Sequence, residues 1–281
     1  MKVLIIGAKG MLGQELVKVF SDQDVIAWDR QECDITNKDE TQKRVRELGP
    51  NFIINAAAYN NVDKAEEEKK VADQLNGYAV GYLAEAAKEL DVPIVHYSTE
   101  YIFRGDKEKG YKEEDERPDP VSAYGMSKYL GELELAKNTD KYYLIRLSRL
   151  FGKMGAGENV KRSFVDTMLE LGKTKDELDI VDEEVSSPTY APDLAKQTRG
   201  IIDGNYDFGI YHAANRGACT WYGFAQQIFK DAQIDIKLNP VSGDKFPRPA
   251  KRPQFAILLN TKTPEGRSWQ EALKEYINEI K

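Results

Sequence analysis

The feature that most constrains the fold is a glycine-rich segment directly after a short apolar run near the start of the chain. Val3 to Ile6 is predicted to be a strand, and Gly7, Gly10 and Gly13 follow where a predicted helix begins. Glycines let a tight turn approach a pyrophosphate, and a helix N-terminus offers free N–H groups there. The spacing is GxxGxxG rather than the usual GxGxxG, so a plain strand-to-helix turn is a second interpretation.

Short β-branched runs alternate with longer helical patterns through the first half. Strands are predicted at residues 3–6, 25–28, 52–55, 94–98 and 142–146, and helices at residues 10–20, 38–48, 71–90 and 122–136. This alternation predicts βαβ units, and therefore an α/β fold with a Rossmann-type, doubly wound parallel sheet.

The second half is less regular. Helices are predicted at residues 160–171, 193–203, 221–232 and 268–280, and strands at residues 178–181 and 210–213. Residues 239–253 carry four prolines and are predicted to be loop. We expect a Rossmann domain over residues 1–150. Residues 151–281 form a mainly substrate-binding, partly interleaved region, with segments near 183–215 returning to the first domain.

Composition narrows the function. The formal charge of −7 argues against a nucleic-acid partner. No stretch approaches the roughly 20 apolar residues of a membrane helix, so we expect no membrane partner and a cytoplasmic location. Cys33 and Cys219 lie far apart, and there are only two histidines. We therefore predict no metal site and two partly buried histidines near strand ends, His96 and His212.

Charged residues follow the second predicted strand. Asp29 lies 22 positions after Gly7, where an acidic residue binds the ribose hydroxyls of NAD. Arg30 comes next, and arginine at such a place accommodates the extra phosphate of NADP. The pair leaves the choice between NADPH and NADH open, and either side chain alone is equally consistent with a solvated charge.

Tyr124 and Lys128 lie four residues apart in a predicted helix, so they share one face. An ammonium about 4 Å from a phenol contributes roughly 4 kcal/mol at an effective dielectric of about 20, which predicts a lowered phenol pKa. Such a tyrosine is a competent general acid for carbonyl reduction. The pattern is common by chance, but it follows Ser98 and Thr99, two hydroxyls at the carboxyl end of the fourth strand, where ligands of such sheets bind.

At this point the sequence resembles the extended short-chain dehydrogenases/reductases, and within them the dTDP-4-dehydrorhamnose reductases, over nearly its whole length. The resemblance is carried by the glycine loop, DIT at 34–36, NAAAY at 55–59, VDKAE at 62–66, YSTEYIF at 97–103, YGMSK at 124–128 with Gly131-Glu132, SPTY at 187–190 and WYGFA at 221–225.

The resemblance implies that Tyr124 donates a proton, Lys128 binds the nicotinamide ribose and Thr99 bonds the reacting oxygen. It implies reduction of a dTDP-linked 4-keto-6-deoxy sugar at C4 to dTDP-L-rhamnose, with NADPH or NADH. The other implied cofactor contacts are Gly7, Gly10, Met11, Leu12, Gly13, Asp34, Ile35, Ala56, Ala57, Ala58 and Tyr59. The other expected substrate contacts are Glu100, Tyr101, Phe103, Arg149 and Arg252.

Several positions depart from the family pattern. Glu100 replaces an aspartate, and Arg149 replaces a tryptophan that would pack against the sugar. Arg149 is suited instead to a phosphate or another anionic group, which leaves the sugar undetermined. Ser186 stands where a glycine is usual, and Ala256 and Leu259 replace a serine and an aspartate. Arg252 keeps the family's Arg-Pro and is suited to a diphosphate.

Three alternatives stay open. A dehydratase would carry Thr-Asp-Glu at the strand end, whereas Thr99-Glu100-Tyr101 supplies one carboxylate. An epimerase would share the scaffold but retain its cofactor. A regulatory subunit would keep the fold without catalysis. A homodimer is possible, and Glu15 is placed to join an intersubunit metal site as in some relatives, although a solvated helix charge is the favoured interpretation.

Overall fold

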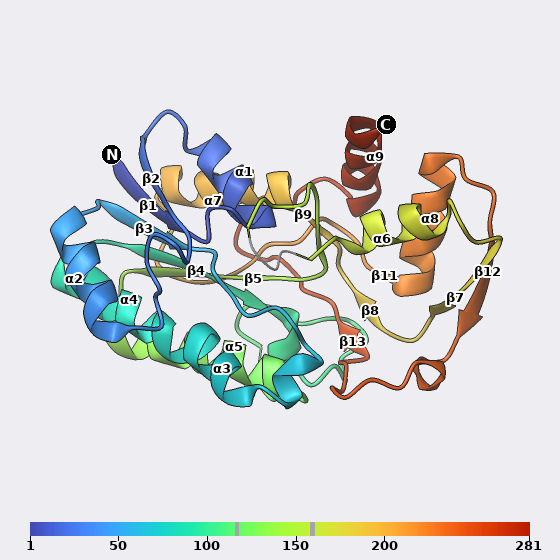
Figure 1. Ribbon diagram of the computed structural model, residues 1–281, viewed down its shortest axis with the longest axis horizontal. Helices are drawn as coiled ribbons and strands as arrows, with labels where there is room; N and C mark the ends of the chain where they lie inside the picture. The colour runs from blue at the N-terminus through green and yellow to red at the C-terminus, as the bar shows by residue number, and fades with distance from the viewer. Residues whose placement is uncertain (116–117, 158–160) are drawn as a thin grey trace.

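A computed structural model describes residues 1–115, 118–157 and 161–281 of the chain. Its main lobe is built on a six-stranded sheet with the strand order β10-β5-β4-β3-β1-β2, in which every pair is parallel (Figure 1). The strands are β1 (Lys2–Ile6), β2 (Asp24–Trp28), β3 (Phe52–Asn55), β4 (Ile94–Thr99), β5 (Tyr142–Leu147) and β10 (Gly209–His212). The predicted fold class is confirmed.

Helices cover both faces of this sheet because its central strands are apolar on both sides. Val3 and Ile5 of β1 pack with α1 (Met11–Val19) and α7 (Ala191–Asp203). The alternate residues Leu4 and Ile6 face the other layer. That layer contains α2 (Lys38–Leu48), α4 (Ala79–Glu89) and α5 (Ala123–Asn138), and the two layers lie on opposite sides of the sheet in Figure 1.

The single helix expected over residues 71–90 is interrupted. The structure has α3 (Lys69–Asp73), a π-helical turn (Gln74–Tyr78) and then α4. Asn76 lies in the π turn and is fully buried. Its side chain accepts from the Tyr59 backbone N–H at 2.8 Å, and it donates to the Tyr59 carbonyl at 3.0 Å and to the Ser127 hydroxyl at 2.9 Å. These hydrogen bonds stabilise the wider π-helical turn, which the periodicity of apolar residues does not predict.

A small lobe lies at the other end of the molecule (Figure 1). Its helices are α6 (Phe164–Leu171), α8 (Trp221–Ala232) and α9 (Trp269–Ile280). Its strands are β7 (Glu177–Val181), β8 (Val185–Ser186), β11 (Cys219–Thr220), β12 (Lys237–Val241) and β13 (Phe255–Ala256). A short parallel pair, β6 (Leu150–Phe151) with β9 (Thr189–Tyr190), lies next to it. An aromatic cluster that includes Phe151, Phe224 and Trp269 forms its core.

Two boundaries differ from the prediction. The expected loop over 239–253 is wrong at its start, because residues 239–241 belong to β12, which pairs with β7. Pro240 is tolerated because β12 pairs only with β7, so a residue on its free edge needs no backbone N–H for pairing. The helix expected from Val160 begins at Phe164, capped by Ser163 and Asp166, and Val160 itself lies outside the described residues.

The chain passes between the lobes more than once. After β5 it enters the small lobe, and it then returns through α7, which packs on α1, and through β10, which pairs with β5. The exact division into domains stays a prediction. Among the described residues, no helix is both long enough and apolar enough to span a membrane.

Candidate active site

The glycine loop lies at the carboxyl end of β1, next to the carboxyl end of β3. The sheet is wound to one side from β1 to β2 and to the other from β3 onward, and ligands bind at such a switch point. Gly7 has φ +75°, and a Cβ there would lie 2.7 Å from the Ala57 nitrogen. A Cβ on Gly13 would lie 2.0 Å from the Gly7 oxygen. Both positions therefore require glycine.

The first turn of α1 begins at this crevice, and the backbone at Gly155 packs closely against it, since a Cβ on Gly155 would lie 2.9 Å from the Met11 nitrogen. Gly10 caps the helix without any side-chain hydrogen bond, so no side chain competes for the N–H groups of the first turn, at Met11 and Leu12. Ala56, Ala57, Ala58 and Tyr59 are partly buried on the other side of the switch point. A cradle free of side chains at a helix N-terminus fits a dinucleotide pyrophosphate.

The residues after β2 form the edge of this cradle. The Asp29 carboxylate accepts from the backbone N–H of Lys9 at 3.2 Å and of Arg30 at 2.8 Å. The Arg30 side chain is 82% exposed and lies 3.8 Å from Asp34, so it is accessible to a phosphate. Asp34 accepts from the Thr36 hydroxyl at 2.6 Å, and this bond lowers the pKa of Asp34. Ile35 is buried in the core behind it.

Helix α5 brings Tyr124 and Lys128 to the carboxyl end of β4. Ser122 caps the helix and accepts from the Gly125 N–H at 3.2 Å, so the helix begins just before Tyr124. A Cβ on Gly125 would lie 2.3 Å from the Tyr101 carbonyl oxygen. This contact explains the glycine after Tyr124 in the motif, because only glycine lets α5 approach the segment after β4 so closely.

Lys128 is buried, and its Nζ donates to the Tyr97 carbonyl at 2.6 Å and lies 3.4 Å from His96 Nε2. Burial lowers the pKa of Lys128 to about 8. The expectation that Lys128 lowers the pKa of Tyr124 is wrong for this arrangement. Burial raises the phenol pKa, and the Glu100 charge raises it further, while Thr99 acts in the opposite direction. The Lys128 amine is directed instead at the Tyr97 carbonyl of β4.

Thr99 and Glu100 lie beside Tyr124. The Thr99 hydroxyl donates to the Glu100 carboxylate at 2.7 Å, and Glu100 is 5% exposed. Burial raises the pKa of Glu100, although Thr99 and other hydrogen bonds oppose it. The Tyr101 ring meets the Tyr124 ring edge-on, with a centroid distance of 5.5 Å. Thr99, Glu100, Tyr101, Tyr124 and Lys128 thus form one group, as the sequence predicted.

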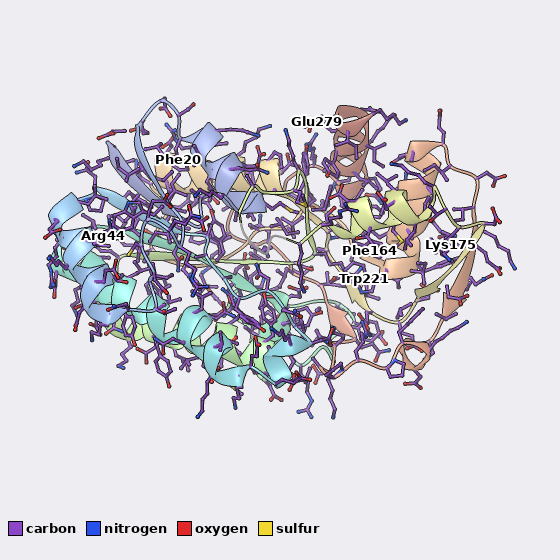
Figure 2. All side chains as sticks on the ribbon, in the orientation of Figure 1. Phe20, Arg44, Phe164, Lys175, Trp221 and Glu279 are labelled. Carbon is purple, nitrogen blue, oxygen red and sulfur yellow. The ribbon has the colours of Figure 1, made fainter. Side chains whose placement is uncertain are left out.

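Arg149 lies next to this group but is tied to the small lobe. Its guanidinium donates to the carbonyls of Cys219 at 2.8 Å and Glu184 at 2.6 Å, and lies 3.9 Å from the centre of the Trp221 ring. Figure 2 shows Trp221 beside Phe164 on the neighbouring helix. Burial lowers the pKa of Arg149, and the charge of Glu100 acts in the opposite direction, so the two side chains interact electrostatically.

The remaining predicted substrate residues have firm partners in the structure. Arg252 pairs with Asp63 at 2.7 Å and donates to the Ala250 carbonyl at 2.8 Å. Phe103 is 2% exposed and stacks on Tyr111, with a distance of 4.2 Å between the ring centroids. The structure therefore places it in the core rather than with Tyr124.

Glu15 is buried and bonded to Lys18 at 2.7 Å, so the expectation of a solvated charge is wrong. No group of three His, Cys, Asp or Glu side chains suited to a metal occurs within residues 1–115, 118–157 and 161–281.

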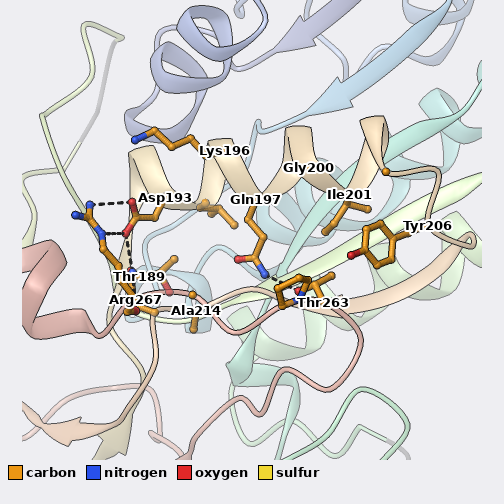
Figure 3. Close-up of a pocket in the computed structure, with 15 residues that line it drawn as sticks. Thr189, Asp193, Lys196, Gln197, Gly200, Ile201, Tyr206, Ala214, Thr263 and Arg267 are labelled. Atoms are coloured by element: carbon orange, nitrogen blue, oxygen red, sulfur yellow. Dashed lines mark hydrogen bonds and ion pairs between the residues drawn. The ribbon is translucent and has the colours of Figure 1, made fainter.

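A cavity of about 550 Å³ lies along α7, and its lining includes none of Thr99, Tyr124 and Lys128 (Figure 3). Its lining includes Gln197 and Gly200 of α7 and Thr263 of the facing segment. Arg267 at its edge is bound by both carboxylate oxygens of Asp193, at 2.8 Å each. The charges of Asp193 and Arg267 are therefore paired with each other.

The geometry can be compared with known proteins. The family profile described as "RmlD substrate binding domain" matches residues 1–281. The chain belongs to the RmlD family. It is 38% identical to a dTDP-4-dehydrorhamnose reductase of Aggregatibacter actinomycetemcomitans, over 97% of each chain.

Two solved RmlD-like structures are also similar. One is a dTDP-4-dehydrorhamnose reductase from Clostridium acetobutylicum, with a TM-score of 0.94, 40% identity and coverage of 100% of this chain and 99% of the other. A second, from Bacillus anthracis in complex with NADP, has a TM-score of 0.93 and 35% identity, over 99% of each chain.

Three side chains around this site were not predicted from the sequence. His96 was expected to be an ordinary partly buried histidine, yet it is fully buried and faces Lys128. Asn55 and Asn76 were assigned no role, although they hold His96 and Tyr59. The asparagine directly before three alanines was the available signal, since a polar side chain ending a buried strand needs a partner.

Proposed function

We propose that this chain catalyses the NAD(P)H-dependent reduction of the C4 keto group of dTDP-4-dehydro-L-rhamnose to dTDP-L-rhamnose, a step in nucleotide-sugar biosynthesis for cell-surface polysaccharide. The observation that carries the proposal is the meeting of Thr99, Tyr124 and Lys128 at the end of β4, beside a glycine cradle at the switch point of the sheet. Membership of the RmlD family supports the substrate.

The nicotinamide supplies a hydride when the cofactor is bound. Gly7, Gly10 and Gly13 would hold its pyrophosphate, and Lys128 would hold the adjoining ribose. Arg30, which is exposed, would contact the additional phosphate of NADPH.

Tyr124 would donate its phenolic proton to the carbonyl oxygen as the C4 carbon is reduced. The O–H bond of Tyr124 breaks, the O–H bond of the sugar alcohol forms, and the phenolate then regains a proton from solvent. The raised pKa of Tyr124 keeps the phenol protonated at neutral pH, and the alkoxide formed at C4 is a stronger base than a phenolate. Thr99 would orient the carbonyl oxygen.

Glu100 and Arg149 shape the rest of the pocket in this proposal. Their opposite charges interact, so a neutral deoxy sugar would meet a polar wall at the position where the resemblance led us to expect a tryptophan. Arg252 would meet the diphosphate only if it exchanged some of its contact with Asp63. Another nucleotide-linked keto sugar is therefore the second candidate substrate.

The test is cofactor oxidation with dTDP-4-dehydro-L-rhamnose and other nucleotide-linked keto sugars. A reductase consumes one NAD(P)H for each sugar, whereas an epimerase needs only catalytic amounts and a regulatory subunit consumes none. Tyr124→Phe should keep cofactor binding and lower turnover by on the order of 10²-fold or more. Near-normal turnover in that variant would contradict the catalytic assignment.

A cytoplasmic location and a homodimer are further parts of the proposal. Cell fractionation tests the location, and sedimentation of the purified chain tests the assembly.

A further inference from the structure

A buried row of polar side chains connects β3 to the active-site lysine. Asn55 at the end of β3 and His96 of β4 are both 0% exposed, and Lys128 of α5 is 2% exposed. Asn55 and His96 are directly paired in the sheet register, so their side chains lie on one face. Asn55 Nδ2 lies 3.2 Å from His96 Nδ1, and His96 Nε2 lies 3.4 Å from Lys128 Nζ.

A backbone hydrogen bond fixes the orientation of the Asn55 side-chain amide. Its Oδ1 accepts from the Ala57 backbone N–H at 3.1 Å, so its Nδ2 faces the imidazole. An amide NH₂ group only donates, and His96 Nδ1 must therefore accept. A neutral ring then carries its proton on Nε2, which faces Lys128. Burial lowers the pKa of His96 well below its usual value, and Lys128 acts in the same direction, against the Asn55 backbone carbonyl.

This tautomer places a donor opposite Lys128 Nζ. An ammonium group only donates, so it cannot accept from His96 Nε2–H, whereas a neutral amine has a lone pair that can. The neutral amine can still donate to the Tyr97 carbonyl. Asn55 and His96 therefore disfavour the charged form of Lys128, in the same direction as burial.

Two further titratable side chains of α5, Glu132 and Tyr124, lie one turn to either side of Lys128. Glu132 lies one turn further along α5 and favours the charged amine. Its carboxylate is bound by Arg146 of β5, at 3.0 and 2.7 Å, which weakens that effect. Tyr124 lies one turn earlier on the same helix and is neutral at physiological pH because its pKa is raised.

We propose that Asn55 and His96 are positioning residues that act through Lys128: by presenting a donor to its amine they disfavour the charged form, and they thereby lower the alkaline limit of the reaction. The inference rests on the proposed reductase function for its kinetic part. Its structural part, the His96 tautomer, is independent of any activity.

The first test is ¹⁵N NMR of the two histidines in the full chain. The structure predicts opposite tautomers, which gives an internal reference. His212 Nδ1 lies 3.1 Å from the Leu259 carbonyl, which only accepts, so His212 carries its proton on Nδ1. His96 should carry its proton on Nε2, and its signals should shift as Lys128 titrates, with a change lost in Lys128→Met. A proton on Nδ1 of His96 would overturn the proposal even if the enzyme were fully active.

The second test is Asn55→Asp. One carboxylate oxygen still accepts from Ala57, and the other accepts from His96 Nδ1, which moves the ring proton and leaves Nε2 free to accept from the ammonium. The alkaline limb of kcat/KM should move up by about one pH unit or more. An unchanged limb would overturn the proposal.

A double variant separates this relay from a simple charge effect. In Asn55→Asp with His96→Leu, the carboxylate stays but the ring is gone. The upward shift relative to His96→Leu alone should disappear. A shift that persists would mean that the new charge acts through space, and would refute the role of His96. If the chain reduces no sugar at all, the NMR result still decides the tautomer.

Discussion

Replacing Arg146 by methionine should destabilise the protein strongly, because it leaves Glu132 charged and buried. The side chains of Arg146 and Glu132 are only 4% and 5% exposed. They share two hydrogen bonds, of 3.0 and 2.7 Å, and the guanidinium also lies 5.3 Å from the centre of the Phe103 ring. Removing one partner of such a pair typically costs about 3–5 kcal/mol. For a chain of this size that corresponds to a melting temperature lower by roughly 6–12 °C.

Equilibrium urea unfolding measures the change in the free energy of unfolding. A matched double variant, Arg146→Met with Glu132→Leu, removes both charges and should recover most of the stability. A loss below about 1 kcal/mol in the single variant, or no recovery in the double variant, would refute the reasoning.

Three further predictions concern the glycines, the lysine and the cofactor. Gly13→Ala should abolish cofactor binding in a fluorescence titration, since its Cβ would lie 2.0 Å from the Gly7 oxygen. The Cβ of Gly200→Ala meets nothing within 4 Å, so that variant should stabilise α7 by about 0.5–1 kcal/mol. Lys128→Met should be more stable than the natural chain, and the gain should be largest at pH 7. It should shrink between pH 8 and 10.5, because the pKa of Lys128 is about 8 in the folded chain, below its unfolded value, and the penalty of burying the charge fades as the amine deprotonates. A gain that grows with pH would contradict this. Arg30→Ala should weaken NADPH and leave NADH binding unchanged, and equal loss for both would exclude a phosphate contact.

The main lobe was predictable because its elements are long and strongly patterned. Continuous apolar strands alternate with amphipathic helices over the first five strands, and the glycine loop marks the first crossover. In the small lobe, the helices α6, α8 and α9 and the strand β7 were also predicted, but β8, β11 and β13 were not, because they have two residues each, too few to show any periodicity. Pro240 also disguised β12, since proline in a strand is acceptable only where one edge is free.

The site was predictable as a set of positions but not as a set of contacts. The order of the glycine loop, Thr99, Tyr124 and Lys128 along the chain places them together once the parallel sheet is accepted. What Lys128 touches depends on the register that pairs Asn55 with His96, which no local pattern reveals. The same limit applies to Arg149, whose partners Cys219 and Glu184 come from distant segments.

The repeated passage of the chain between the lobes affects how this protein can be re-engineered. Because α7 and β10 return to the main sheet before α8 and α9 complete the small lobe, no single cut separates one lobe from the other. A chimera that takes the small lobe from a relative must join the chain at several points. For the proposed function, we therefore expect a substrate preference to be transferred more readily by replacing single side chains, such as Arg149, than by exchanging whole segments.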